Sequence, residues 1–335
     1  MSDEVILVIE TIVMLSLVIL SGMMVRKIGL LDEGATKKLS NLVVDFAFPA
    51  LVFTSMLRTI DSQRLAEYWH MPLIGLSIML LGIGIGYLAL PFLKRQKKES
   101  HHGSTAFVIG TPNWLFIPLP IAIALYGDDG ERTVLLFNVG ALLVFWSLGV
   151  WIVKGGKPDM NSLRTLAMNP GLLATLLGIV VALAFPWTRT LEGLDITNAS
   201  LGLAVSSILI QAMVFVGDVT VPLAMVVTGS LLAGAGARKA WNRYVISISA
   251  IRLIAVPACI IFILWLAGVI GIKMTSYLTT IIIITAAMPV AVTCSVVVEK
   301  YDKDVPLVTR AIFVSTIASV ITIPVIVWIV RIIGL

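Results

Sequence analysis

The sequence predicts an all-α polytopic membrane protein of ten transmembrane helices, arranged as two repeats of five. Three observations support this prediction: the composition, the spacing of apolar segments, and sequence matches at a constant offset. Of the 335 residues, 59% are hydrophobic and only 13% are charged, and the mean hydropathy is +1.03. Soluble domains of this length do not have such a composition.

Apolar segments of about 20 residues, the length that a helix needs to cross a bilayer, recur ten times with short connections. No inserted soluble domain separates them. We number the segments 1 to 10, and their approximate bounds are 5–25, 39–57, 69–92, 104–126, 133–153, 166–186, 203–233, 244–268, 277–298 and 311–330.

Charge in the connecting loops predicts the orientation, because Lys and Arg accumulate on the cytoplasmic side of membrane proteins. Seventeen basic residues follow the odd-numbered segments, six lie on the opposite side, and Arg252 lies inside segment 8. We therefore expect a multi-pass protein of the cell membrane with both termini outside the cytoplasm. The seventeen are Arg26, Lys27, Lys37, Lys38, Lys94, Arg95, Lys97, Lys98, Lys154, Lys157, Arg164, Arg238, Lys239, Arg243, Lys300, Lys303 and Arg310, and the six are Arg58, Arg64, Arg132, Arg189, Lys273 and Arg331.

Three sequence matches relate the first half of the chain to the second. Segments 2 and 7 share the pattern D-x-x-x-P, which starts at Asp45 and at Asp218. Segment 4 exits through Tyr126-Gly127-Asp128-Asp129 and segment 9 through Tyr301-Asp302-Lys303-Asp304, and segments 5 and 10 both end in Val-Trp-Ile-Val. The similar offsets predict repeats at 1–160 and 161–335. Since five is odd, the second repeat enters the membrane inverted, as in alternating-access carriers.

Segment 4 contains a stretch that cannot form a continuous helix. Between Gly110 and Pro120 it also holds Pro112 and Pro118. Each proline removes a backbone N–H donor and clashes with the preceding turn, at a cost of roughly 3 kcal/mol inside a helix. Lipid offers no water to satisfy the carbonyl groups that are freed. The break must therefore face protein or a wet cavity, and we interpret it as half of a substrate site.

The repeat supplies the other half of this site. It places Asn113 and Trp114 opposite Met288 and Pro289 of segment 9, which predicts a second discontinuous helix. We expect the two helices to cross near the midplane of the membrane, with half-helix N-termini directed at the crossing point. Such ends carry partial positive charge and free N–H groups, which favours an anion.

Polar and small side chains around the two breaks are the candidates for substrate contact. Asn113 offers two donors and an acceptor, although it could instead only cap a broken helix. Hydroxyl groups just after the second break could bind substrate or bond their own backbone, and Trp114 could pack, gate or stack. The candidate residues are Thr111, Pro112, Asn113, Trp114, Pro120, Pro289, Thr293, Cys294 and Ser295, and the breaks are assigned to Pro112, Pro118, Pro120 and Pro289.

Four charged residues, Glu10, Asp45, Asp218 and Arg252, lie inside apolar segments. An ionisable group at such a position is a candidate for function. Asp45 and Asp218 could couple transport to protons or a cation, or they could satisfy backbone that a nearby proline disturbs. Arg252 could oppose a carboxylate of the substrate or pair with Asp45. We expect the ion pair, because Arg252 is predicted to lie in the cytoplasmic half, away from the midplane.

These motifs resemble those of the auxin efflux carrier family, which includes plant auxin carriers and bacterial permeases for malate- or malonate-type acids. The similarity covers essentially the whole chain and is consistent with a bacterial or archaeal member. It rests on Pro112-Asn113, Pro120 and Tyr126-Gly127 in segment 4, on Ala287-Met288-Pro289 and Glu299-Lys300-Tyr301 in segment 9, and more weakly on Asn169-Pro170 and on Arg252 ahead of Pro257.

The resemblance implies a fold like that of sodium/proton antiporters and bile-acid carriers. In this fold a scaffold of segments 1, 2, 6 and 7 supports a moving bundle of segments 3–5 and 8–10. The resemblance also implies elevator-type alternating access, homodimers through the scaffold, and an organic anion bound at Asn113. Pro118, Cys294 and Trp114 depart from the residues usual in the family, so the identity of the substrate does not carry over.

The prediction is therefore a secondary-active or facilitative transporter of a small carboxylate, auxin-like or malate- or malonate-like. Arg252 as the single intramembrane cation favours a monoanion. One alternative is a Na⁺- or H⁺-coupled antiporter or symporter of the same fold, but the lack of acidic residues at both breaks disfavours it. Another is a channel, which the inverted repeat disfavours. We expect no enzyme, since no H-E-x-x-H motif, paired-aspartate metal motif or Ser/His dyad occurs, and no cofactor, metal or nucleic-acid partner.

Overall fold

The computed structural model describes residues 3–93, 101–155, 164, 167–192, 194, 199–234, 241–271 and 274–333, and no β-strand occurs among them. Seven helical runs in these residues are long and apolar enough to cross a membrane, and Pro170–Ala184 and Ser276–Ala286 are shorter apolar helices. The expectation of an all-helical, multi-pass membrane protein is confirmed. The start of segment 6 and the basic residues Lys94, Arg95, Lys97, Lys98, Lys157, Arg238, Lys239 and Lys273 lie outside the described residues.

The helices follow the apolar segments closely. Those of the first half are α1 (Asp3–Lys27), α2 (Glu33–Leu42), α3 (Phe48–Thr59), α4 (Ser62–Tyr68), α5 (Met71–Ala89), α6 (His101–Gly110), α7 (Pro118–Val144) and α8 (Val150–Lys154). Those of the second half are α10 (Pro170–Ala184), α11 (Leu201–Asp218), α12 (Thr220–Gly234), α14 (Arg243–Ala250), α15 (Val256–Val269), α16 (Ser276–Ala286), α17 (Thr293–Lys300) and α18 (Val305–Ile333).

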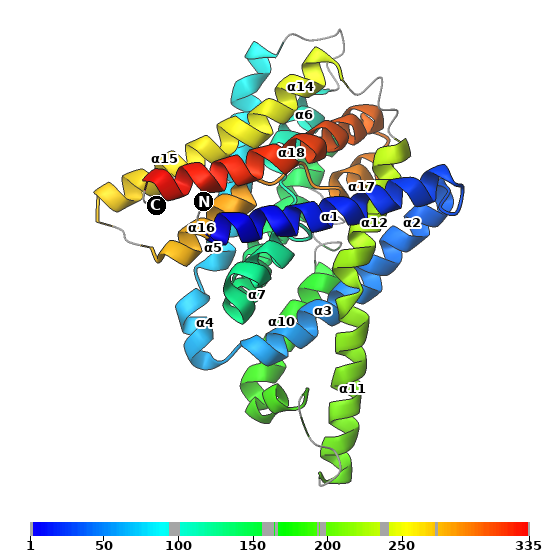
Figure 1. The fold of residues 1–335 in the computed structure, drawn as a ribbon, viewed down its shortest axis with the longest axis vertical. Helices are drawn as coiled ribbons and strands as arrows, with labels where there is room; N and C mark the ends of the chain where they lie inside the picture. The colour runs from blue at the N-terminus through cyan, green and yellow to red at the C-terminus, as the bar shows by residue number, and fades with distance from the viewer. Residues whose placement is uncertain are drawn as a thin grey trace.

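Helices from the two halves of the chain pack against each other (Figure 1). α1 packs along α12 and α3 packs along α10, while within the first half α5 packs on α6 and α7. α1 and α18 run side by side, and both termini lie on the same side of the molecule, where Arg331 forms an ion pair with Glu4. α11 projects from the body at the bottom of Figure 1 and exposes large apolar side chains such as Leu209 and Phe215.

Three helical runs widen into a π-turn: η1 (Val43–Ala47), η3 (Phe145–Gly149) and η6 (Ile251–Ala255). Two of these turns directly precede the helices that begin with Pro49 and Pro257 in their first turn. A proline ring clashes with the carbonyl four residues before it, and a widened turn accommodates this clash without ending the helix. The run from α2 to α3 and the run from α14 to α15 therefore each remain long enough to span a membrane.

Segments 4 and 5 are joined by a tight reversal at Gly127, where the sequence predicted a short loop. Gly127 has a φ of 56° and a ψ of −136° within α7, a conformation that glycine adopts at little cost. Gly130 lies against the backbone of Ala122, so the two parts of α7 fold back on each other. Segment 5 consequently begins before residue 133, and it includes Glu131 and Arg132, which are both buried.

Helices α5 and α7 approach each other backbone to backbone at two glycines. A Cβ atom at Gly75 would lie 2.2 Å from the carbonyl oxygen of Phe137, and one at Gly140 would lie 1.7 Å from the carbonyl oxygen of Pro72. Small residues permit this close packing between membrane helices, where van der Waals contact replaces the hydrophobic effect. This contact fixes α5 against the part of α7 that carries Asn138.

The substitution Gly75→Val is expected to lower the thermal unfolding temperature of the detergent-solubilised protein clearly, because overpacking costs about 1–3 kcal/mol. Gly84→Val is the matched control on the same helix, since a Cβ atom at Gly84 meets no atom within 4 Å. Equal unfolding temperatures for the two variants would contradict the close helix contact.

Candidate functional site

Two interrupted helical segments cross each other at the centre of the structure. α6 ends at Gly110 and α7 begins at Pro118, while α16 ends at Ala286 and α17 begins at Thr293. The two interruptions form an antiparallel bridge between Pro112 and Val290. The sequence placed the two breaks opposite each other, and the structure brings them into direct contact.

Backbone hydrogen bonds join the two interruptions. The N–H of Asn113 donates to the carbonyl of Pro289 at 2.7 Å, and the N–H of Ala291 donates to the carbonyl of Thr111 at 3.0 Å. The hydroxyl of Ser315 on α18 accepts the N–H of Val290 at 3.1 Å. Each interruption thus supplies partners for backbone groups of the other that a regular helix would have paired internally.

The prolines have two different roles at this crossing. Pro112 lies within the first interruption and Pro289 within the second. Pro118 and Pro120 instead lie in the first turn of α7, where the N–H that a proline lacks would have no intrahelical partner. Of the predicted break positions, these two therefore start the second half-helix and do not interrupt it.

A cavity of about 50 Å³ lies beside the crossing, which is room for about three to five water molecules. Its walls are aromatic and aliphatic, with a few polar groups, and the described residues that line it include no charged side chain. These residues are Val44, Phe48, Asn113, Trp114, Leu115, Phe116, Asn138, Leu142, Phe145, Trp146, Asn169, Ala291, Val292 and Thr293.

Asn138 on α7 is the most informative polar group of this cavity. The indole Nε1 of Trp114 donates a hydrogen bond of 2.8 Å to its Oδ1. Because an indole N–H can only donate, the amide atom that faces it must be the oxygen. The Nδ2 group is buried and has no partner among the described residues. Asn138 therefore presents a buried, unused hydrogen-bond donor at the cavity.

Asn113 and Asn169 use their side chains in the same way. Oδ1 of Asn113 accepts the N–H of Phe116 at 3.1 Å, which shapes the chain between the two half-helices. Oδ1 of Asn169 accepts the N–H of Leu172 at 2.9 Å and caps α10. In all three carboxamides the oxygen is engaged by the protein, so the amide NH₂ is the group left for a ligand.

The helix ends at the cavity reinforce this preference for donors. The cavity borders Leu115 and Phe116 just before α7, and Ala291 to Thr293 where α17 begins. A helix N-terminus carries a partial positive charge. The two half-helix N-termini and the three amide groups together suit an acceptor or an anion.

Three of the nine predicted contact residues line the cavity: Asn113, Trp114 and Thr293. The other six do not: Thr111 and Cys294 are completely buried, and Ser295 lines a separate, larger cavity. Pro112, Pro120 and Pro289 shape the backbone of the two segments. Sequence reasoning missed Asn138 as a site residue, although its position as a lone amide in the apolar run from 134 to 146 was a signal.

Arg252 corrects the prediction of an ion pair with Asp45. Its side chain is completely buried, donates from Nη1 to the carbonyl of Ile109 at 2.9 Å, and donates from Nη2 to the carbonyl of Ala286. It therefore lies at the crossing itself and not away from it. Since Arg252 does not line the cavity, it is not placed to oppose a bound carboxylate there.

The three acidic candidates do not lie at the crossing. Glu10, Asp45 and Asp218 are all exposed on the surface of the chain. Asp218 ends α11. Asp45 lies on η1 and lines a larger cavity of about 460 Å³, which also includes Trp146, Asn169 and Thr293 of the central cavity. We call this larger cavity the vestibule.

A second vestibule of about 660 Å³ shares Ser40 and Asn41 of α2 with the first. Lys37 of α2 and Glu299 of α17 form an ion pair of 2.7 Å at its wall. Its basic residues Arg26, Lys37, Lys300 and Arg310, and Arg164 of the first vestibule, all belong to the basic loops that follow the odd-numbered segments. Both vestibules therefore open toward the same, basic side of the molecule.

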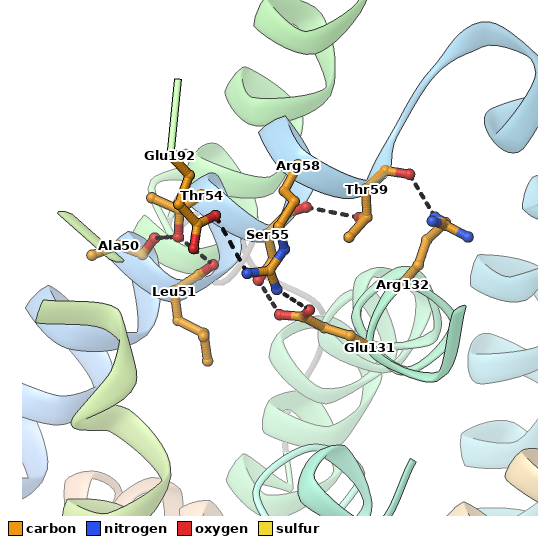
Figure 2. A network of polar contacts seen from close by, with 9 residues as sticks. All are labelled: Ala50, Leu51, Thr54, Ser55, Arg58, Thr59, Glu131, Arg132 and Glu192. Atoms are coloured by element: carbon orange, nitrogen blue, oxygen red, sulfur yellow. Dashed lines mark hydrogen bonds and ion pairs between the residues drawn. The ribbon is translucent and has the colours of Figure 1, made fainter. Parts of the chain in front are cut away.

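A network of charged and polar groups joins α3 to α7 (Figure 2). The carboxylate of Glu131 on α7 is only 3% exposed, and it accepts hydrogen bonds from the hydroxyl of Ser55 and the guanidinium of Arg58 on α3. Arg58 also forms an ion pair with Glu192 at 3.5 Å. These contacts tie the C-terminal half of α3 to α7.

Arg132 adds a second tie between the same helices. Its Nε donates to the carbonyl of Thr59 at the end of α3 at 2.6 Å (Figure 2). Its guanidinium lies 5.3 Å from the centre of the Tyr68 ring. Along the continuous run from α2 to α3, the vestibule residues 40–45 come first, then Phe48 of the cavity, and then the network residues 55–59. Along this run, the cavity therefore lies between the vestibules and the Glu131 network.

Glu131→Gln is expected to lower the free energy of unfolding by about 1–3 kcal/mol, because it removes a hydrogen-bonded charge from a buried site. Glu192→Gln serves as the control, since Glu192 is 38% exposed and lies 3.5 Å from the same arginine, where an ion pair contributes about 1 kcal/mol or less. Thermal unfolding in detergent compares the two. A larger loss for Glu192→Gln would contradict the central place of Glu131 in the network.

Comparison with known proteins identifies the family. A model of the family described as membrane transport protein matches residues 7–162 and 159–327. An uncharacterized transporter of Methanocaldococcus jannaschii is 23% identical over 324 residues, which cover 96% of this chain and 98% of the relative. An uncharacterized transporter of Methanothermobacter thermautotrophicus is 26% identical over 322 residues, which cover 94% and 96%. The chain therefore belongs to the membrane transport protein family, and its resemblance to the auxin efflux carriers is confirmed.

Proposed function

We propose that this transporter carries a small organic anion and binds its carboxylate in the cavity at the crossing. The observation that carries the proposal is the donor set of Asn113, Asn138 and Asn169, whose oxygens are all engaged within the protein. A carboxylate has only acceptor atoms, so it complements amide NH₂ groups and helix N-termini. No acidic residue lies among the described residues of the cavity wall, which leaves a cation without strong ligands.

The cavity also restricts the size and the charge of the anion. A space of about 50 Å³ accepts a carboxylate with a few further atoms. Aromatic walls from Phe48, Phe116, Phe145 and Trp146 suit an apolar remainder. A second carboxylate would be buried without a cationic partner, which is costly. We therefore favour a small monoanion over a dicarboxylate.

Alternating access is the mechanism that we propose for this carrier. Ten membrane segments in two inverted halves, 1–160 and 161–335, would form a scaffold of segments 1, 2, 6 and 7 and a bundle of segments 3–5 and 8–10. The contact between two interrupted helices, one in each half, supports this arrangement. With basic loops in the cytoplasm and both termini outside, the vestibules face the cytoplasm and the Glu131 network closes the outer side.

The exposed apolar face of the scaffold is part of the same proposal. α10 and α11 expose Leu173, Leu177, Leu209 and Phe215 among other large apolar side chains. Such a face suits lipid tails, and we propose that part of it is covered by the scaffold of a second copy. The cell membrane is the proposed location, because the described residues hold candidate membrane spans in both halves of the chain.

Coupling to Na⁺ or H⁺ is the second candidate function. The observation that favours it is Asp45, whose side chain lines the vestibule next to Asn169 and Thr293. A carboxylate at an entrance can titrate or hold a cation as substrate passes. Because both Asp45 and Asp218 are exposed and lie away from the crossing, we propose an anion carrier that does not depend on them for coupling.

A thermal-shift screen of organic acids on purified protein tests the anion site. We expect a small monocarboxylate to stabilise the wild type, and Asn113→Ala or Asn138→Ala to weaken its binding about ten- to a hundredfold, the loss of one hydrogen bond to a charged group. Asn138→Asp should abolish binding, because it adds a negative charge at the same place.

The matched control for this screen is Gln211→Ala, which removes a carboxamide from exposed α11 and should leave affinity unchanged. Stabilisation by cations, or tighter ligand binding to Asn138→Asp, would contradict an anion site.

The double variant Asp45→Asn, Asp218→Asn tests the coupling alternative in proteoliposomes. We expect uptake of the anion identified by the screen to keep its dependence on pH and on sodium, since neither carboxylate reaches the central cavity. A loss of that dependence, with transport itself retained, would assign the coupling role to these residues and replace our proposal on this point.

A further inference from the structure

Arg252 is a large, fully buried side chain that the proposed binding of substrate does not use. It lies on the π-turn η6, which packs against α6, α14, α15 and α18. Its two terminal nitrogens donate to the carbonyls of Ile109 and Ala286. These carbonyls belong to the last turns of α6 and α16, so one guanidinium joins the C-terminal ends of both half-helices.

The guanidinium of Arg252 faces two helix ends of partial negative charge through its two terminal nitrogens. A helix C-terminus leaves carbonyl groups without intrahelical partners and carries about half a unit of negative charge. Two such ends meet at Arg252, and together they carry roughly the charge that one guanidinium neutralises. No carboxylate among the described residues forms an ion pair with Arg252. The helix ends therefore supply the partner that a buried cation requires.

The position of Arg252 divides the crossing into two sides. The cavity borders the N-terminal ends of α7 and α17, while Arg252 holds the C-terminal ends of α6 and α16. Each interruption closely follows one of the two carbonyls that Arg252 binds, because α6 ends one residue after Ile109 and α16 ends at Ala286. Asn113 follows Ile109 by four positions, and its N–H donates to Pro289, which follows Ala286 by three. A fixed distance between the two carbonyls therefore sets how the interruptions meet.

We propose that Arg252 is a positioning residue: a built-in counter-cation that clamps the C-terminal ends of both half-helices and thereby holds Asn113 toward the cavity. The clamp deepens the proposed function, since it orients a residue of the anion site, but its geometry does not depend on any ligand. A planar guanidinium reaches two carbonyls in fixed directions, whereas the single ammonium of a lysine is a point charge.

Hydrogen–deuterium exchange at the amides of Asn113 and Ala291 tests the clamp, because both N–H groups donate across the crossing. In Arg252→Ala we expect exchange at these two amides to rise about tenfold or more, as one or two hydrogen bonds to a charged group are lost. Millimolar methylguanidinium should restore slow exchange by filling the vacated space. Arg252→Lys should fold and show an intermediate rate.

Arg132→Ala is the matched control. Arg132 is also buried and also donates to a carbonyl at a helix end, that of Thr59, but it lies away from the crossing. We expect this variant to leave exchange at Asn113 and Ala291 unchanged and to be insensitive to methylguanidinium.

Two results would overturn the clamp. One is an exchange rate at both amides that equals the wild-type rate in Arg252→Ala or in Arg252→Lys. If the alanine variant does not fold, the rate in the lysine variant decides between the two outcomes. The other is a uniform rise in exchange over the whole chain without rescue by methylguanidinium, as expected for general destabilisation. The readout needs no substrate, so a failed screen of organic acids would refute the anion site and leave this test intact.

Discussion

The structure depends on the mutual pairing of two backbone interruptions inside an apolar chain. Backbone N–H and C=O groups that lack helical partners cannot turn to water at this depth. The N–H groups of Asn113 and Ala291 are therefore satisfied across the crossing, and that of Val290 by Ser315. Prolines at both breaks and at the start of α7 add no donors that would need partners. The need to pair these backbone groups explains why the two interruptions contact each other and do not face lipid.

The crossing also separates charge without any acidic residue. Four half-helices end or begin there, so partial negative charge gathers at α6 and α16, and partial positive charge at α7 and α17. Arg252 neutralises the first pair of ends, and the cavity lies at the second. The donors of the cavity are carboxamides whose orientation the protein fixes by engaging their oxygens. An arrangement of this kind can bind a carboxylate while keeping the site itself neutral.

The run from α2 to α3 connects the vestibules, the central cavity and the Glu131 network. The run from α2 to α3 passes from the open vestibules, past Phe48, to the buried carboxylate of Glu131. The proline-associated π-turn η1 lies in this run beside the cavity. Ties between α3 and α7 lie at one end of this run, and the Lys37–Glu299 pair between α2 and α17 lies at the other. In the proposed alternating-access mechanism, these contacts join elements that would move apart.

Much of this arrangement follows from the sequence alone, because the forces concerned are local. Segment length and hydropathy predict membrane helices, prolines predict the interruptions at Pro112 and Pro289, and the repeat predicts that these interruptions meet. Asn113 and Trp114 are predicted to lie at the site because they belong to the first of these interruptions. These features need only the chain's own covalent geometry and the absence of water in a bilayer.

Only the tertiary structure decided which side chains share the cavity and what Arg252 binds. The partners of Arg252 are backbone carbonyls, which have no signature in a sequence, so an ion pair with Asp45 was the natural expectation and was wrong. Asn138 in α7 and Asn169 at the start of α10 meet at the cavity only through tertiary packing, and the glycine contact of α5 with α7 fixes the part that carries Asn138. The burial of Glu131 depends on the reversal at Gly127. Local rules predict where a helix breaks, whereas the partner of a buried polar group depends on the packing of the whole molecule.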